Sequence, residues 1–142
     1  MDELELIEAI ENDCWNESQP VIERVVGSAK RRINAELRGQ SCFPDEFPSY
    51  LKPFDMISVM YAKGTTDSFN PFLCDYIDNV LEDEYERLSS AEKTILRYCD
   101  CHSIMEHSYS SPMKFITAAF WSSVDEHSGC ARVRRYLDRV GL

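Results

Sequence analysis

The stretch PFLCDYIDNVLEDEYERL, Pro71 to Leu88, carries the clearest periodic pattern in the chain. Its apolar residues recur at steps of three and four, which places side chains on one face of an α-helix. Asn70 can cap this helix, and Pro71 suits its first turn, where a missing N–H costs nothing. The predicted apolar face comprises Phe72, Leu73, Tyr76, Ile77, Val80, Leu81, Tyr85 and Leu88.

The N-terminal sequence has the same helical period. One helix is predicted around residues 4–15 and a second after it, with Ser18 as the cap and Pro20 in its first turn. Gly39 is predicted to end the second helix, because glycine is the common residue just past a helix end. The apolar face of this second helix would comprise Val21, Ile22, Val25, Val26, Ala29, Ile33 and Leu37.

Three further helices are predicted towards the C-terminus, in addition to a short one over 54–63. Ser89 and Glu92 have the spacing of a capping box, which opens one of them. Pro112 opens the next, whose body MKFITAAFWSSV is apolar nearly all round and is expected to be the most buried helix. Gly129 separates the last of these helices from the one before it. With no alternating strand pattern and 142 residues, the sequence predicts one all-α domain over residues 1–142, a bundle of about six or seven helices.

A proline-rich connection, GQSCFPDEFPSYLKP, spans Gly39 to Pro53. Three prolines exclude a helix there, and a connection of this length is often a binding element. It displays Phe43, Phe47 and Tyr50. These aromatics either pin the loop to the core or serve as anchors for a partner.

The net charge of −10 opposes general attraction to nucleic acid or to an anionic membrane, and it favours basic partners. No apolar run approaches the ~18 residues of a transmembrane helix. The start, MDELELIEAIENDCW, is acidic and amphipathic, unlike a secretory signal. We therefore expect a cytoplasmic protein with its six cysteines reduced: Cys14, Cys42, Cys74, Cys99, Cys101 and Cys130.

The stretch YCDCHSIMEH, Tyr98 to His107, is the one place where metal-ligand residue types crowd together. Helical spacing puts Cys99, His102 and Glu106 in one arc, and these side chains are acceptable zinc ligands. A structural zinc site needs a fourth ligand, however, and no second ligand pair exists. Since the same arc is apolar, His102 is interpreted as a core histidine, and neither a metal nor another cofactor is expected.

Catalytic motifs are absent as well. There is no G-x-S-x-G elbow, no glycine-rich phosphate loop and no H-E-x-x-H. His107 and His127 each stand in an EHS triplet where a helix is expected to end, and the helix dipole favours a histidine there. We therefore do not expect an enzyme, although a dispersed active site would leave no motif.

The helix from Pro71 separates its charges from its apolar face. Its acids are not paired with any lysine, although like charges at helical spacing repel. The acidic face is either a solubility surface or a docking surface for a basic protein. The acids are Asp75, Asp78, Glu82, Asp83 and Glu86.

This profile of a small, acidic, single-domain chain without catalytic motifs resembles the bacterial toxin-immunity proteins, including those of contact-dependent growth inhibition systems. The resemblance covers the whole chain, but no signature motif carries it and no residue is transferred. It implies tight binding to one cognate toxin domain, often a basic nuclease, whose active site or substrate surface is blocked.

The predicted function is therefore a stoichiometric inhibitor that binds a basic protein partner, with no direct nucleic-acid or membrane contact. The acidic face would supply the electrostatic contact, and Phe43, Phe47 or Tyr50 would fill a pocket of the partner. Two alternatives remain open: a helical adaptor or regulatory subunit, and a metalloprotein or enzyme centred on Cys99, His102 and Glu106.

Overall fold

The computed structural model is an all-α bundle, and it contains no strand in the part of the chain that it describes. Six helices pack together: α1 Glu3–Glu36, α2 Pro53–Ala62, α4 Pro71–Glu86, α5 Ser90–Ser103, α6 Pro112–His127 and α7 Ala131–Arg139. The backbone is described for residues 3–39, 43, 47–64, 71–103 and 112–141, and the side chains in these ranges except 3–16, 71, 98–103 and 112.

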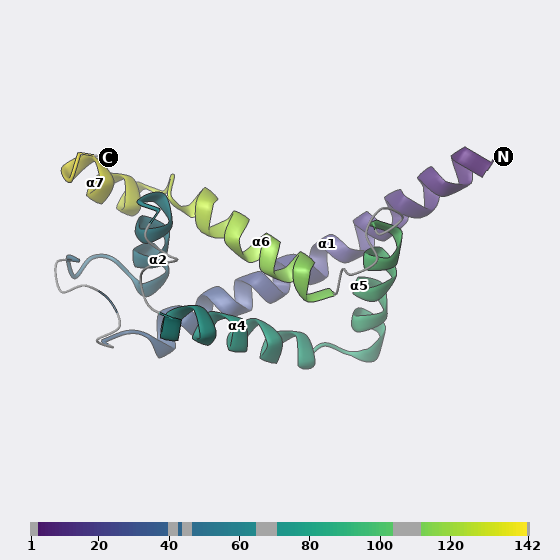
Figure 1. Ribbon diagram of the computed structural model, residues 1–142, viewed down its shortest axis with the longest axis horizontal. Coiled ribbons are helices and arrows are strands. Elements are labelled where there is room, and N and C mark those ends of the chain that lie inside the picture. The colour runs from purple at the N-terminus through teal and green to yellow at the C-terminus, as the bar shows by residue number, and fades with distance from the viewer. Residues whose placement is uncertain (1–2, 40–42, 44–46, 65–70, 104–111, 142) are drawn as a thin grey trace.

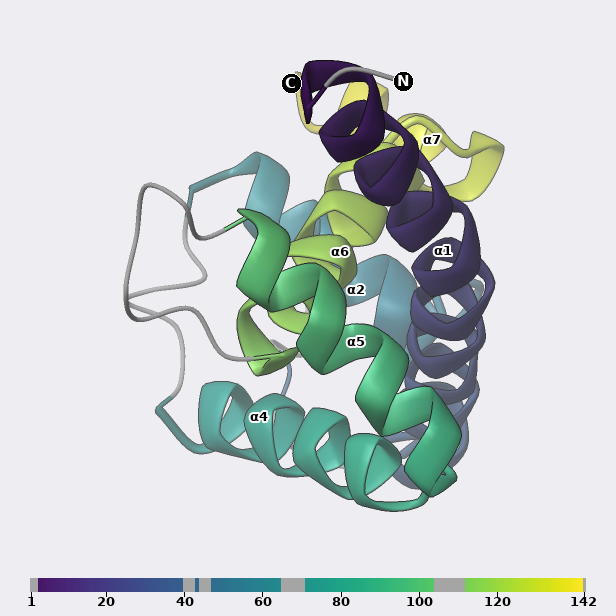
Figure 2. The same cartoon turned by 90° about the vertical axis from the view of Figure 1, so that its right-hand side faces the viewer.

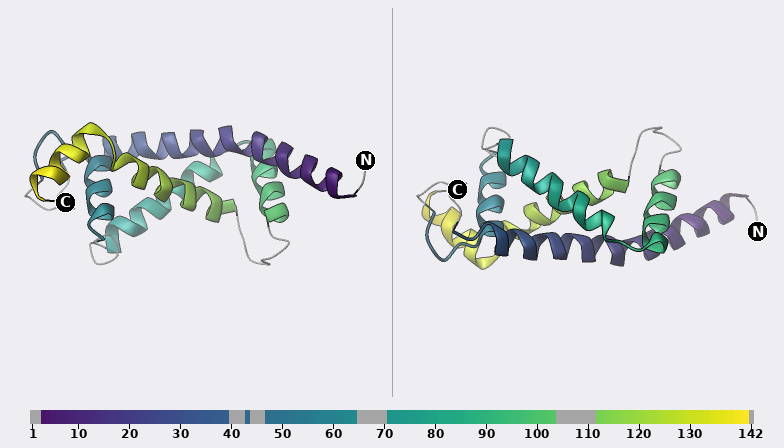
Figure 3. Two further views of the ribbon diagram at one scale, coloured as in Figure 1. Left: turned by 90° about the horizontal axis from the view of Figure 1, so that it is seen from above. Right: turned by 90° about the horizontal axis from the view of Figure 1, so that it is seen from below.

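The long helix α1 is the spine of the bundle and runs along most of its length (Figure 3). It packs against α2, α4, α5 and α6. In Figure 1, α2 and α5 stand across opposite ends, and α4 spans the distance between them along the lower edge. Seen from the α5 end, α5 lies in front of α6 and α2 (Figure 2). The predicted all-α fold is confirmed.

The core lies where the apolar faces of these helices meet. The predicted faces of α1 after Pro20 and of α4 are buried as expected, except that Tyr76 is only partly buried and Phe72 is exposed. Phe54 and Phe120 contact each other edge to face at the centre, with ring centroids 5.9 Å apart. The largest fully buried side chains are Phe54, Phe120, Ile33, Ile57, Ile77, Leu81, Leu96, Ile116, Leu137, Val59, Val124 and Val133.

A second, smaller apolar cluster joins α7 to the rest. It consists of Leu51, Val59, Val133, Tyr136 and Leu137. Among the helices, α7 packs principally on α2, whose Phe54 and Ile57 belong to the main core while Val59 belongs to the smaller cluster. Helix α2 is therefore the element that both clusters share.

Several predicted helix boundaries are confirmed. Pro71 and Pro112 stand at the first positions of α4 and α6, and Gly39 follows α1 with a φ of 77°, a conformation that glycine adopts without strain. Helix α2 starts at Pro53, one residue before the predicted start. The capping box is present, because the amide N of Glu92 lies 3.2 Å from Oγ of Ser89 and the amide N of Ser89 lies 3.0 Å from Oε1 of Glu92.

The expected break between two N-terminal helices is wrong. Helix α1 is continuous, with Pro20 in its interior, so Ser18 is a helical residue and not a cap. A proline removes one backbone hydrogen bond from a helix, but the residues after it bury a continuous apolar face that keeps the helix in place. Val21, Ile22 and Val25 form the start of that face.

The expectation that the helix starting at Pro112 is the most buried is also wrong. Helix α6 buries only Ile116, Phe120 and Val124, a single stripe at steps of four. Its Trp121 is only partly buried and stacks on the exposed ring of Tyr61, with centroids 5.9 Å apart. The shorter α2 is more enclosed, with seven of its ten residues buried. No helix among the described residues is both long and apolar enough to span a membrane.

Candidate protein-binding surface

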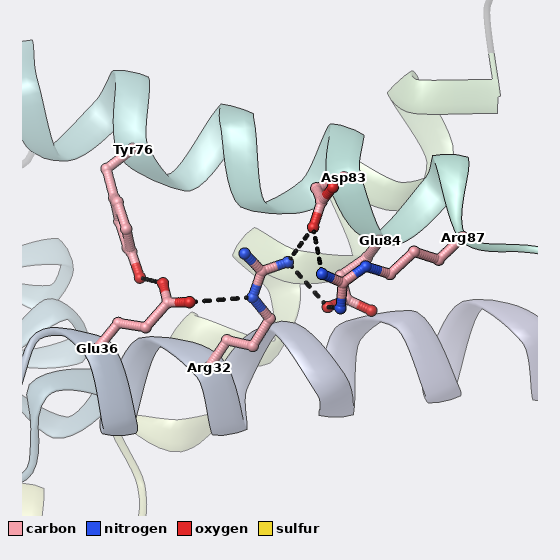
Figure 4. Close-up of polar contacts among 6 residues, drawn as sticks. All are labelled: Arg32, Glu36, Tyr76, Asp83, Glu84 and Arg87. Carbon is pink, nitrogen blue, oxygen red and sulfur yellow. Dashed lines mark hydrogen bonds and ion pairs between the residues drawn. The ribbon is translucent and has the colours of Figure 1, made fainter.

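The acidic residues of α4 fall into two rows with different surroundings. Residues 75, 78, 82 and 86 are three or four positions apart, so they share the side of the helix that faces away from the core, and all four are exposed. Asp83 and Glu84 lie closer to α1 (Figure 4). The sequence placed Asp83 in one acidic face with the outer row, and the structure separates it from that row.

The inner row is bridged to α1 by Arg32 (Figure 4). Its Nη1 lies 2.6 Å from Oδ2 of Asp83 and 3.1 Å from Oε1 of Glu84. Arg87 adds a contact of 3.1 Å to Oδ2 of Asp83. Glu84 is only 7% exposed. Pairing across helices cannot be read from the spacing within one helix, so the contacts with Arg32 have no signal in the sequence of α4.

The same arginine is held on its other side by Glu36, which accepts a hydrogen bond from the Tyr76 hydroxyl (Figure 4). Burial lowers the pKa of the Arg32 guanidinium, but Glu84, Asp83 and Glu36 outweigh that effect and raise the pKa above its usual range. The Tyr76 hydrogen bond, with Arg32 nearby, holds the pKa of the Glu36 carboxyl below its usual value. Arg32 and Glu36 therefore stay charged at neutral pH, and the network fixes α4 to α1.

One acid of the outer row also has a cation. Oε2 of Glu86 lies 3.3 Å from Nζ of Lys93 on α5. Asp75, Asp78 and Glu82 form no ion pair with any other described residue. We call these three residues the acidic stripe. Its members repel one another, because Asp78 is three residues from Asp75 and four from Glu82.

Phe72 lies at the N-terminal end of the stripe and is 66% exposed. Its predicted place on the core face is wrong. Phe72 is seven residues before Asn79, which is also exposed, so two helical turns place both on the outward side of α4. Sequence reasoning missed this because neighbouring apolar residues, Phe72 and Leu73, do not both face the core.

The aromatic residues of the proline-rich connection pack against the bundle. Phe43 and Phe47 lie against the main core, and Phe47 contacts Tyr136 edge to face at 5.5 Å between centroids. The guanidinium carbon of Arg135 lies 4.7 Å from the centre of the Tyr50 ring. This packing supports the interpretation that they pin the loop. Their role as anchors for a partner stays a prediction.

A separate buried polar cluster joins α2 to the C-terminal helices. Asp55 is 1% exposed and is hydrogen-bonded on both oxygens. Its Oδ2 accepts from the backbone amide of Lys52 at 2.9 Å and from Nε of Arg132 at 2.9 Å, and its Oδ1 lies 2.5 Å from Nε2 of His127. Burial would raise the pKa of Asp55, but these hydrogen bonds outweigh it and hold the carboxyl well below its usual range.

This cluster is the part of the described chain where metal-ligand atoms meet: a carboxylate oxygen of Asp55, a ring nitrogen of His127 and Sγ of Cys130 all lie within 4.8 Å of one another. Sequence reasoning missed it, because His127 was interpreted from its place at a helix end. The side chains of Cys99, His102 and Glu106, the residues that the sequence brought forward as possible ligands, lie outside the described residues.

Comparison with known proteins gives no relative: no family model, no curated protein and no solved structure matches this chain.

Proposed function

We propose that this protein is a stoichiometric inhibitor of the toxin-immunity type, which binds a basic partner protein through the acidic stripe of α4. The observation that carries the proposal is the uneven pairing of the α4 acids. Asp83 and Glu84 have arginine partners and Glu86 has a lysine, whereas Asp75, Asp78 and Glu82 have none among the described residues. A stripe of like charges costs folding stability and favours a cationic partner.

The way α4 is attached to α1 suits a role in binding a partner protein. The Arg32 network holds the helix against α1, so the stripe is presented on a rigid element and little order has to be gained on binding. Phe72 adds an exposed aromatic side chain at one end of the stripe. Exposed aromatic residues beside charged ones are typical of the anchors of protein interfaces.

The experiment starts from the native partner, captured from the source cell at low salt on the immobilised chain and identified by mass spectrometry. The partner is then purified and titrated calorimetrically with the wild type and with a triple variant, Asp75→Lys, Asp78→Lys and Glu82→Lys. Asp83 is left unchanged because it also bridges to α1. A matched control reverses three exposed acids elsewhere: Glu23, Asp125 and Glu126.

We expect a 1:1 complex, a stripe variant that binds at least about tenfold more weakly, and a control within about threefold of the wild type. The difference in affinity between the wild type and the stripe variant should become smaller as salt is added, because screening weakens exposed charge contacts. Equal binding by the stripe variant and the control would overturn the role of the stripe. A partner that stays active in the 1:1 complex would favour the adaptor alternative over inhibition.

A further inference from the structure

Three helices bring three different metal-ligand atoms to one point. Asp55 lies in the first turn of α2, His127 is the last residue of α6, and Cys130 precedes the first residue of α7. Nε2 of His127 lies 2.5 Å from Oδ1 of Asp55 and 3.7 Å from Sγ of Cys130. Ligand atoms around a tetrahedral zinc ion, with bonds of about 2.0–2.3 Å, are about 3.3–3.7 Å apart. The Nε2–Sγ distance matches this separation, whereas Nε2 and Oδ1 are in direct hydrogen-bond contact and have to move apart to admit an ion.

The same ring nitrogen of His127 faces both Asp55 and Cys130. This geometry distinguishes a metal site from the active site of a cysteine hydrolase. In a cysteine hydrolase, one nitrogen faces the nucleophile and the other faces the orienting carboxylate. Here Nε2 is nearest to both Sγ of Cys130 and Oδ1 of Asp55. This arrangement does not match the relay of a cysteine hydrolase, and its nitrogen, oxygen and sulfur are all ligand types that zinc binds.

The surroundings of Asp55 resemble those of a metal-binding carboxylate. Its Oδ2 is held by the amide of Lys52 and by Nε of Arg132, so the carboxyl group is oriented with Oδ1 towards His127. Such outer hydrogen bonds are typical supports of metal ligands. The ring of Phe54 packs edge to face on the His127 ring, with centroids 4.9 Å apart, and restricts its rotation.

The guanidinium of Arg132 is the group that would compete with an ion, and its geometry leaves room for one. Its contact with Oδ1 of Asp55 is the longer of the two, at 3.3 Å, while the Nε contact with Oδ2 is 2.9 Å. The side chain is 46% exposed and can shift outward. The contact of Arg132 with Oδ1 can therefore break while its Nε contact with Oδ2 still orients the carboxylate.

We propose that Asp55, His127 and Cys130 form a binding site for a zinc-type divalent cation, with the fourth position filled by water. His127 and Cys130 are partly exposed, which gives the ion a path of entry. Binding forms bonds to Oδ1, Nε2 and Sγ; the thiol proton of Cys130 passes to solvent, and Nε2 binds as a neutral imidazole nitrogen. The thiolate and the carboxylate balance the two positive charges, and the ion ties α2, α6 and α7 together.

The test uses the full chain, reduced and stripped of metal, titrated with Co²⁺ as a spectroscopic probe and then with Zn²⁺. We expect one Co²⁺ per chain with a near-ultraviolet band from thiolate coordination, and displacement by Zn²⁺. The variant Cys130→Ser should lose this band and bind at least about 100-fold more weakly. The matched control Cys74→Ser, at another partly buried cysteine, should keep it.

A second readout is thermal unfolding followed by circular dichroism. Zn²⁺ in excess should raise the Tm of the wild type and of Cys74→Ser, but not that of Cys130→Ser or His127→Gln, because only an ion that binds the folded state stabilises it. The proposal is overturned if the wild type binds no stoichiometric Co²⁺. It is also overturned if Cys130→Ser binds as the wild type does, which would place the ion elsewhere, for example at Cys99 and His102.

Discussion

Arg132 and Asp55 are 77 positions apart in the sequence, yet Nε of Arg132 lies 2.9 Å from Oδ2 of Asp55. The carboxylate is buried and the arginine is half-exposed, so the pair closes the junction between α2 and α7 from its solvent side. Neither residue stands out in the sequence, but their contact is the polar link between the two apolar clusters.

This link predicts a contrast between two arginines of α7. Arg132 and Arg134 both have side chains that are 46% exposed, but Arg132 binds buried Asp55 and Arg134 binds Asp138, which is 68% exposed. Arg132→Ala should lower the free energy of unfolding by about 2–3 kcal/mol, because it removes a charged partner from a buried carboxylate. Arg134→Ala should cost less than about 0.5 kcal/mol. Urea unfolding measures both, and similar losses would contradict the assigned role of Asp55.

Stability should fall in acid through the same carboxylate. The pKa of Asp55 is lower in the folded chain than in the unfolded chain, where it is about 4. Its contribution is therefore complete above about pH 4 and is lost as the pH falls below that value. We expect a loss of about 2 kcal/mol between pH 6 and pH 2 that the less stable Asp55→Asn variant lacks. Urea titrations at both pH values measure it, with Asp138→Asn as an exposed control that should keep the wild-type slope.

The bridge between α1 and α4 predicts opposite outcomes at two adjacent positions. Arg32 contacts the carboxylates of Asp83 and Glu84, whereas Arg31 is exposed. Arg32→Ala should cost about 1–3 kcal/mol, because buried Glu84 loses its closest cation. Arg31→Ala should stay within about 0.5 kcal/mol of the wild type. If chemical unfolding gave equal losses, the network would not be what fixes α4.

Two phenylalanines test the division between core and surface. Phe120 is fully buried against Phe54, and Phe72 is 66% exposed. Phe120→Ala should lower the free energy of unfolding by about 3–5 kcal/mol through loss of packing and the cavity it leaves. Phe72→Ala should change it by less than about 0.5 kcal/mol and should instead weaken binding of the native partner. A large stability loss in Phe72→Ala would contradict the exposed position of Phe72 and would indicate that its side chain packs in the core.

Local chemistry predicted much of the fold. The apolar periods of α1 and α4, the starting prolines Pro71 and Pro112 and the capping box at Ser89 all act within a few residues, and the structure contains each of them. Pro20 shows the limit of this reasoning. A proline that suits a helix start was equally compatible with a helix interior once the following apolar face was buried.

The polar sites were much less predictable. The acids of α4 look alike along the sequence, and the approach of Arg32 from α1, together with Arg87, separates Asp83 and Glu84 from the stripe. The same holds for Asp55 and Cys130, whose meeting depends on how α2 and α7 dock. Such sites are set by contacts between residues far apart in the chain, for which helical spacing gives no signal.

The docking of α7 principally on α2 has a consequence for how the molecule opens. A terminal helix with one main neighbour can detach while the rest stays folded, so its amide hydrogens should exchange at a lower free energy than those of α1. Any tether attached after Arg139 would pull on this detachable segment first. We therefore expect α7 to detach before α1 when the molecule is pulled from that side.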